Sequence, residues 1–167
     1  MIETLVMIAG AVLLVGAALQ DLIARSIWDE ISFLIAVLGV GMRLHDGSFP
    51  VAIILAATVF CICWVLFSFE LIGGGDVKLL AASTLLLPPA SAPMLLLGVS
   101  MSGGLISLLF WAGRRRVGRP AGAKPQGLFA RALRAERWRL HRGGPIPYAV
   151  AIAFGALNVI FQEVMPR

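Results

Sequence analysis

Two aspartates lie at the ends of long apolar runs, where an ionisable side chain is costly and tends to be functional. Asp21 follows seventeen uncharged residues, and Asp76 follows the triplet Gly73-Gly74-Gly75. Two carboxylates that approach each other suit peptide hydrolysis, because one stays protonated and polarises the scissile carbonyl while the other activates water. The glycines lack a Cβ and so permit positive φ and close backbone approach, which would let an extended substrate reach Asp76.

Each of these features also has a purely structural interpretation. Capping and the helix dipole favour an aspartate at a helix N-terminus, and an aspartate at the end of a span often serves as an interfacial anchor. Glycine runs in membrane proteins usually serve helix packing or a turn. Lys78 is explained most simply as a snorkelling cation, although its charge would also help to hold Asp76 ionised. Glu70 is interpreted as interfacial.

Helix polarity suggests how two such aspartates would divide their roles. Asp76 is predicted at the start of a helix, where the positive end of the dipole favours an anion. Asp21 is predicted near the end of a helix, where the dipole disfavours a negative charge. On this argument Asp76 is the ionised partner and Asp21 carries the shared proton.

The elements that must position these residues are membrane-spanning helices. Of the 167 residues, 59% are hydrophobic and 14% are charged, against roughly 45–50% and about 25% in soluble domains. This composition excludes a soluble fold and predicts an all-α integral membrane protein, a bundle of about six transmembrane helices in a single domain over residues 1–167. Prolines end the fourth span and open the fifth. The predicted spans are residues 4–24, 27–44, 48–69, 76–87, 92–112 and 145–163.

The distribution of positive charge predicts the orientation of the bundle. Six spans place twelve of the fourteen lysines and arginines on one face, ten of them in the basic loop over residues 113–144. The positive-inside rule makes that face cytoplasmic and puts both chain ends outside. Asp21 and Asp76 then share the cytoplasmic face. A helical pattern over residues 127–140 predicts contact with anionic lipid.

The same distribution of lysines and arginines explains the net charge of +5, so the charge does not predict a nucleic-acid partner. The partner that it predicts is the lipid bilayer. Cys61 and Cys63 lie two residues apart inside an apolar run, where they point in different directions on a helix. We therefore expect neither a disulfide nor a metal site from the cysteines.

Three segments resemble one known family. Gly73-Gly74-Gly75-Asp76-Val77-Lys78-Leu79 resembles the G-x-G-D-x-K-L motif of the membrane-embedded GxGD aspartic proteases, specifically the type IV prepilin peptidases. Asp21-Leu22-Ile23-Ala24-Arg25-Ser26-Ile27 is similar to the first-aspartate segment of that family. Pro147-Tyr148-Ala149-Val150-Ala151 resembles the Pro-Tyr-Gly-x-Ala opening of its last helix.

The resemblance implies that Asp21 and Asp76 are the catalytic pair, with Gly73, Gly75 and Lys78 in the motif through which substrate approaches. It implies removal of the leader from prepilin or pseudopilin membrane proteins at the cytoplasmic face of the bacterial inner membrane, without a cofactor or metal. Components of a pilus or secretion assembly are the further partners it implies.

The sequence departs from the family pattern in three places. Trp28-Asp29 stands where the family usually has Pro-Asn, and Ala149 replaces a common glycine. Nothing between Asp21 and Glu30 has room for the cysteine-bearing region that larger, bifunctional members associate with N-methylation, so we expect no methyltransferase activity. The chain is most similar to the small peptidase-only forms that serve tight-adherence, or Flp-type, pili.

Two non-enzymatic interpretations compete with the protease. Paired intramembrane carboxylates also form proton relays, so a transporter or proton-path subunit is one alternative. Such proteins usually show repeats or interrupted helices at the bilayer midplane, whereas these carboxylates are predicted at helix ends. An assembly subunit of a pilus or secretion machine is the other alternative, and it would tolerate loss of either aspartate.

Overall fold

The computed structural model describes residues 1–116, 127 and 146–165. These residues form six α-helices and one 3₁₀ helix and contain no strand, which confirms the all-α class. The predicted helical segment 127–140 lies outside the described residues apart from Gly127. The elements are α1 (Ile2–Ala24), α2 (Asp29–His45), α3 (Phe49–Ser68), α4 (Gly74–Leu86), η1 (Pro89–Ser91), α5 (Ala92–Arg116) and α7 (Tyr148–Val164).

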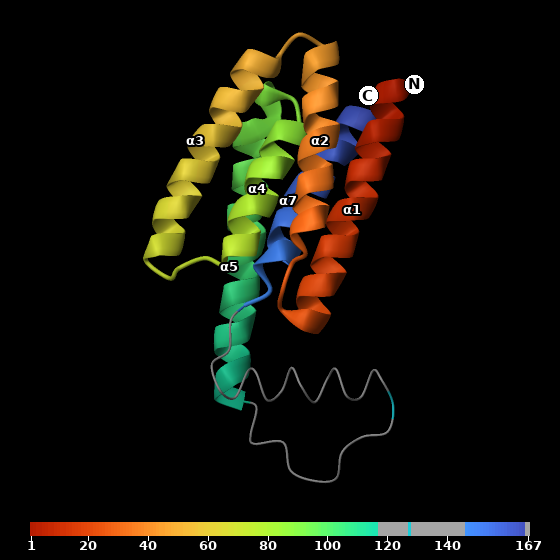
Figure 1. Ribbon diagram of the computed structural model, residues 1–167. Coiled ribbons are helices and arrows are strands. Elements are labelled where there is room, and N and C mark those ends of the chain that lie inside the picture. Colours follow the sequence, from red (N-terminus) through yellow and green to blue (C-terminus); the bar gives the residue numbers. More distant parts are fainter. Residues whose placement is uncertain (117–126, 128–145, 166–167) are drawn as a thin grey trace. The chain divides into compact units, whose positions relative to one another are not determined.

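The chain divides into two compact units. The first contains Met1–Gly103 and Pro147–Arg167, and the second contains Gly104–Ile146. In the first unit α1 to α4 run alternately in opposite directions, so the ends of α1 and α3 lie at the same end as the starts of α2 and α4 (Figure 1). In the second unit the described residues are the C-terminal part of α5 with Gly127 and Ile146.

Within the described part of the chain, length and composition make three helical segments suitable for crossing a membrane. They are Ile2–Ala24, Phe49–Ser68 and Pro89–Gly113, and their outward surfaces carry many exposed large apolar side chains. The helix Tyr148–Val164 is apolar but shorter. Together with the composition, these helices make the chain an integral membrane protein.

The short helix α4 lies at the centre of the first unit. It packs against α2 and α3 and contacts α7, while α1 packs against α7 and α2. Eight of its thirteen residues are buried. Pro88 and Pro89 follow directly after Leu87, and because proline removes a backbone donor and restricts the residue before it, the helix ends there. The helix that carries Asp76 is thus held on several sides.

A glycine allows α2 and α4 to approach closely. A Cβ on Gly39 would lie 2.7 Å from the backbone nitrogen of Leu86 and 2.8 Å from the carbonyl carbon of Leu85. We therefore expect Gly39→Ala to push the two helices apart and to lower the free energy of unfolding by about 1–3 kcal/mol.

Gly41 on the same helix is the matched control, because a Cβ there meets nothing within 4 Å. Gly41→Ala should be neutral or stabilising by up to about 1 kcal/mol, since alanine is the better helix former. Thermal unfolding of the purified protein in detergent measures both effects, and equal midpoints for the two variants would contradict the close approach at Gly39.

Small residues also bring α5 and α7 together within the first unit. A Cβ on Gly98 would lie 3.1 Å from Cα of Gly155, and one on Gly155 would lie 2.8 Å from the backbone nitrogen of Val99. The Ser102 hydroxyl donates a 3.1 Å hydrogen bond to the carbonyl oxygen of Ala151. These contacts fit the packing role expected of small residues in membrane helices, and they hold the N-terminal half of α7 against α5.

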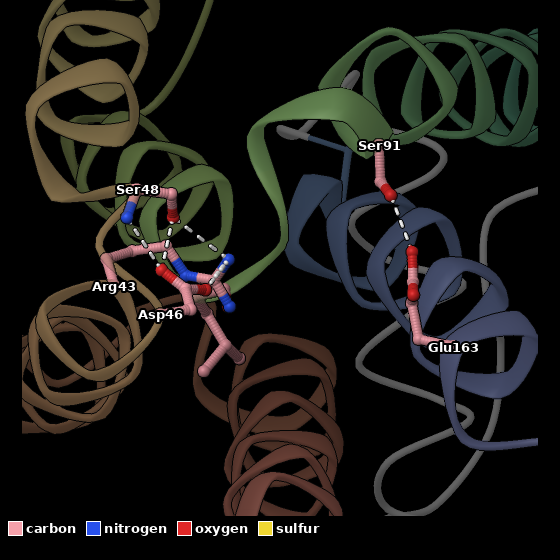
Figure 2. Close-up of polar contacts among 6 residues, drawn as sticks. Arg43, Asp46, Ser48, Ser91 and Glu163 are labelled. Carbon is pink, nitrogen blue, oxygen red and sulfur yellow. Dashed lines mark hydrogen bonds and ion pairs between the residues drawn. The ribbon is translucent and has the colours of Figure 1, made fainter.

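A buried arginine ties the loop between α2 and α3 to the end of α4. Arg43 is 3% exposed and pairs with Asp46 at 2.6 Å, as Figure 2 shows. Its guanidinium also lies 3.5 Å from the carbonyl oxygen of Leu86, at the C-terminal end of α4. The Ser48 backbone N–H donates to Asp46 at 2.9 Å. Nearby, the Ser91 hydroxyl donates to Glu163 at 2.7 Å, which joins the η1 turn to α7 (Figure 2).

The Arg43–Asp46 pair predicts a pH-dependent contribution to stability. Partial burial alone would raise the pKa of Asp46, but hydrogen bonds from Ser48 and the charges of Arg43 and His45 outweigh it and lower the pKa. A carboxylate with a lowered pKa stabilises the fold above its ordinary value of 3.8, and this contribution is lost as the pH falls through the lowered value.

We expect Asp46→Ala to destabilise the protein by about 1 kcal/mol at pH 7, because Arg43 loses its partner while Asp46 itself is partly screened by solvent. The difference from the unsubstituted protein should shrink as the pH falls below 3.8 and through the lowered pKa of Asp46, because both proteins lack the negative charge below it. Thermal midpoints measured from pH 7 down to about pH 2 test the prediction, and a difference that stays constant over the whole range would contradict it.

Candidate active site

Asp21 lies in the last turn of α1 and is 7% exposed. The helix ends when Arg25 adopts a left-handed conformation with φ 53°, and the Arg25 backbone N–H donates to the carbonyl oxygen of Asp21 at 2.9 Å. A left-handed residue at this position is a common way to close a helix, because it satisfies a carbonyl that would otherwise lack a partner. Asp21 is therefore held in a defined, buried position rather than at a frayed end.

Asp76 lies in the first turn of α4, three residues after the N-cap Gly73. Its backbone N–H donates to the carbonyl oxygen of Gly73 at 3.1 Å, and its carboxylate accepts a hydrogen bond from the Gly73 backbone. This arrangement resembles one half of a capping box, in which an acidic side chain at the third position satisfies the N-cap N–H. The capping role considered for Asp76 is thus present, and it orients the carboxylate.

The two aspartates come together at one end of the first unit. They are close enough for the charge of Asp21 to act on the carboxyl group of Asp76. The start of α7 also reaches this place, where the Ala149 backbone N–H donates to Oδ2 of Asp21 at 3.2 Å. Three helix ends therefore meet here: the end of α1 and the starts of α4 and α7.

The three glycines before Asp76 provide close approach but no left-handed turn. Among the described residues the glycine with positive φ is Gly47, so the positive φ that the triplet permits is not used there. A Cβ on Gly75 would lie 3.2 Å from Ile27, whereas one on Gly73 would lie 3.0 Å from Oδ2 of Asp76. Gly75 packs the loop after α1 against α4, and Gly73 keeps the space beside the carboxylate open.

Lys78 makes a close ion pair with Asp29 at the start of α2. The lysine Nζ lies 2.8 and 2.7 Å from the two carboxylate oxygens, and both side chains are exposed. On a helix, residues two apart point in different directions, so Lys78 and Asp76 do not share a face. The observed partner of Lys78 is thus Asp29, one of the residues at which the sequence departs from the family pattern. Glu70 is exposed in the turn before α4, with φ 59°.

Ala149 is the contributor that the sequence argument missed. Its contact with Asp21 joins residues 128 apart in the chain and uses a backbone group, which carries no signature in the side-chain pattern. The one available signal was the Pro-Tyr pair before it, because proline favours the start of a helix. The part of the chain that is described contains no group of three metal-ligating side chains.

These features define the protein as an all-helical membrane protein with a pair of interacting carboxylates at a meeting point of three helix ends. Residues 8–108 match the type IV leader peptidase family, which is more than half of the chain, and the chain belongs to that family. It is therefore a protease. The match includes Asp21 and the Gly73–Lys78 segment and ends before α7. No match was found among curated proteins or among solved structures.

Proposed function

We propose that this chain is an aspartic endopeptidase that removes the leader peptide of prepilin or pseudopilin substrates at the cytoplasmic face of the bacterial inner membrane. The observation that carries the proposal is the approach of Asp21 and Asp76, which lie on different helices far apart in the sequence. The chain's membership of the type IV leader peptidase family supports the same substrate class.

The reaction needs one protonated and one ionised carboxyl group. The ionised carboxylate takes a proton from water as the water oxygen attacks the scissile carbonyl carbon, and the protonated carboxyl group donates to the carbonyl oxygen. The tetrahedral intermediate then collapses and the C–N bond breaks. The carboxyl group that took the proton from water passes it to the leaving nitrogen, and the other carboxylate takes back the proton that it gave to the carbonyl oxygen. No covalent enzyme intermediate forms. Gly73 is exposed and carries no side chain, which supports entry of an extended chain beside Asp76.

The orientation follows from the distribution of charge. The site lies at the end of the first unit where α1 ends and α4 begins, next in sequence to Arg25 and Lys78. Positive charge is retained on the cytoplasmic side of membrane proteins, so this end is proposed to face the cytoplasm, in a multi-pass arrangement. Only four residues, 25–28, separate α1 from α2, which supports peptidase activity without N-methylation.

Mass spectrometry of pilin-like proteins tests the proposal directly. Cells that express the chain should yield substrates whose N-termini are shortened by one leader peptide and carry no additional methyl group. Cells that lack it should retain the leader. Unchanged substrates in both cases would refute the proposed substrate class.

A further inference from the structure

The start of α7 supplies a hydrogen bond to one member of the carboxylate pair. Pro147 is the N-cap of α7, so Tyr148 and Ala149 occupy its first two helical positions. Backbone N–H groups in the first turn of a helix have no acceptor within the helix. The Ala149 N–H is directed instead at Oδ2 of Asp21, 3.2 Å away, in a place where Ala149 is 0% exposed and Asp21 7%.

We propose that Ala149 is a positioning residue of the active site, whose backbone N–H holds Oδ2 of Asp21 as a hydrogen-bond acceptor and so favours the ionised form of Asp21. The inference rests on the proposed function. A donor directed at a carboxylate oxygen stabilises the charged form, and the positive end of the α7 dipole adds to this effect.

This role reverses the assignment that helix polarity suggested from the sequence. From the sequence, the start of α4 favours a negative charge on Asp76 and the C-terminal end of α1 disfavours one on Asp21. The start of α7 brings an opposite helix end to the same carboxylate, so Asp21 is suited to accept the proton of the attacking water. The proton that the two aspartates share is then held mainly by Asp76, whose carboxylate lies next to Gly73, a residue without a side chain.

Other titratable groups lie close to Asp21 in space or in sequence. Asp76 interacts with Asp21 from the start of α4. Arg25 follows Asp21 one helical turn later, at the end of α1, and Tyr148 precedes Ala149 on α7. Asp21 takes part in further polar interactions besides the one with Ala149. Lys78 is paired with Asp29 and so contributes little net charge. A test must therefore remove the Ala149 N–H while leaving these groups in place.

Proline provides that test, because it deletes a backbone donor and is tolerated in the first turn of a helix. Ala149→Pro in the full chain should lower kcat for leader cleavage about 10- to 100-fold with KM nearly unchanged, as expected for loss of a hydrogen bond to a charged group. The acidic limb of the pH–rate profile should move to higher pH, which a merely structural defect would not cause.

Val150→Pro is the matched control, since it places the same ring one residue later and removes a first-turn N–H that makes no described contact with Asp21. It should lower kcat less than about threefold and leave the pH profile in place. If Ala149→Pro is folded and behaves like Val150→Pro, the positioning role is wrong.

A second pair of variants decides the matter if Ala149→Pro does not fold. A serine at an N-cap accepts a hydrogen bond from the second or third N–H of its helix, so Pro147→Ser should divert the Ala149 N–H from Asp21. Pro147→Ala removes the same ring without adding an acceptor. Lower kcat and a shifted acidic limb in Pro147→Ser relative to Pro147→Ala support the role, and equal behaviour overturns it.

The proposed function fails separately from this inference. If Asp21→Asn cleaves the leader normally, the aspartic mechanism itself is wrong. If Asp21→Asn is inactive while the variants at positions 147 and 149 match their controls, the mechanism stands and the role of Ala149 is wrong.

Discussion

Asparagine at position 21 or at position 76 is expected to reduce leader removal at least about 10³-fold, while each variant still inserts into the membrane and folds. The amide has the shape of the carboxyl group but neither gives nor takes the proton that the reaction moves, and proton transfer by a positioned group contributes about 10²–10⁴-fold. Cleavage assays on purified Asp21→Asn and Asp76→Asn measure the loss.

The structure explains why these variants should remain folded. The amide oxygen of asparagine can still accept the hydrogen bond from Ala149 at position 21 and the one from the Gly73 backbone at position 76. Each variant also removes the interaction between two carboxyl groups, so its thermal midpoint should not fall. Glu70→Gln is the control, because Glu70 is exposed and should leave cleavage nearly intact. Full activity in either aspartate variant contradicts the dyad.

The fold class could be predicted from the sequence because its determinants are local. Apolar runs identify the long helices, and the prolines after Leu87 mark the end of α4 without knowledge of any distant contact. Asp21 and Asp76 could also be identified from the sequence as candidate catalytic residues, because the residues directly next to each of them are uncharged. Helix order then brings the end of α1 and the start of α4 to the same end of the first unit.

The interactions that refine the site could not be predicted in the same way. The Asp21–Ala149 contact joins residues 128 apart, and the Lys78–Asp29 pair joins residues 49 apart. Contacts of that range depend on how the helices pack, which periodicity does not determine. The prediction for Asp21 was made from the dipole of its own helix, whereas the field at a carboxylate depends on every helix end nearby, here including the start of α7.

The glycine triplet shows a further limit of sequence reasoning, because glycine is required for different reasons that look the same in the sequence. Gly73 has φ −73° and ψ 144°, a conformation open to any residue. Its lack of a side chain is needed for space, since a Cβ there would lie 3.0 Å from Oδ2 and 3.8 Å from Cγ of Asp76. The backbone therefore tolerates alanine at this position, whereas the Asp76 carboxylate would have to move by a few tenths of an ångström to accommodate it.

Gly73→Ala should accordingly lower kcat/KM for leader cleavage about 10- to 100-fold, because the methyl group turns the carboxylate of Asp76 and occupies the approach beside it, and small misplacements of reacting groups are costly. The free energy of unfolding should fall by less than about 1 kcal/mol, because the one expected cost to the fold is that alanine is a poorer N-cap than glycine. Parallel measurements of cleavage kinetics and thermal unfolding separate the two effects.

Gly74→Ala is the matched control at the next position of the same helix. A Cβ there meets the Phe67 ring at 3.4 Å, an ordinary contact with a side chain, and does not approach Asp76. Its activity should stay within about threefold of the unsubstituted protein, because alanine fits the first turn of a helix. If Gly73→Ala is as active as Gly74→Ala, the space beside Asp76 is not used by the substrate, and the glycine at position 73 serves helix capping alone.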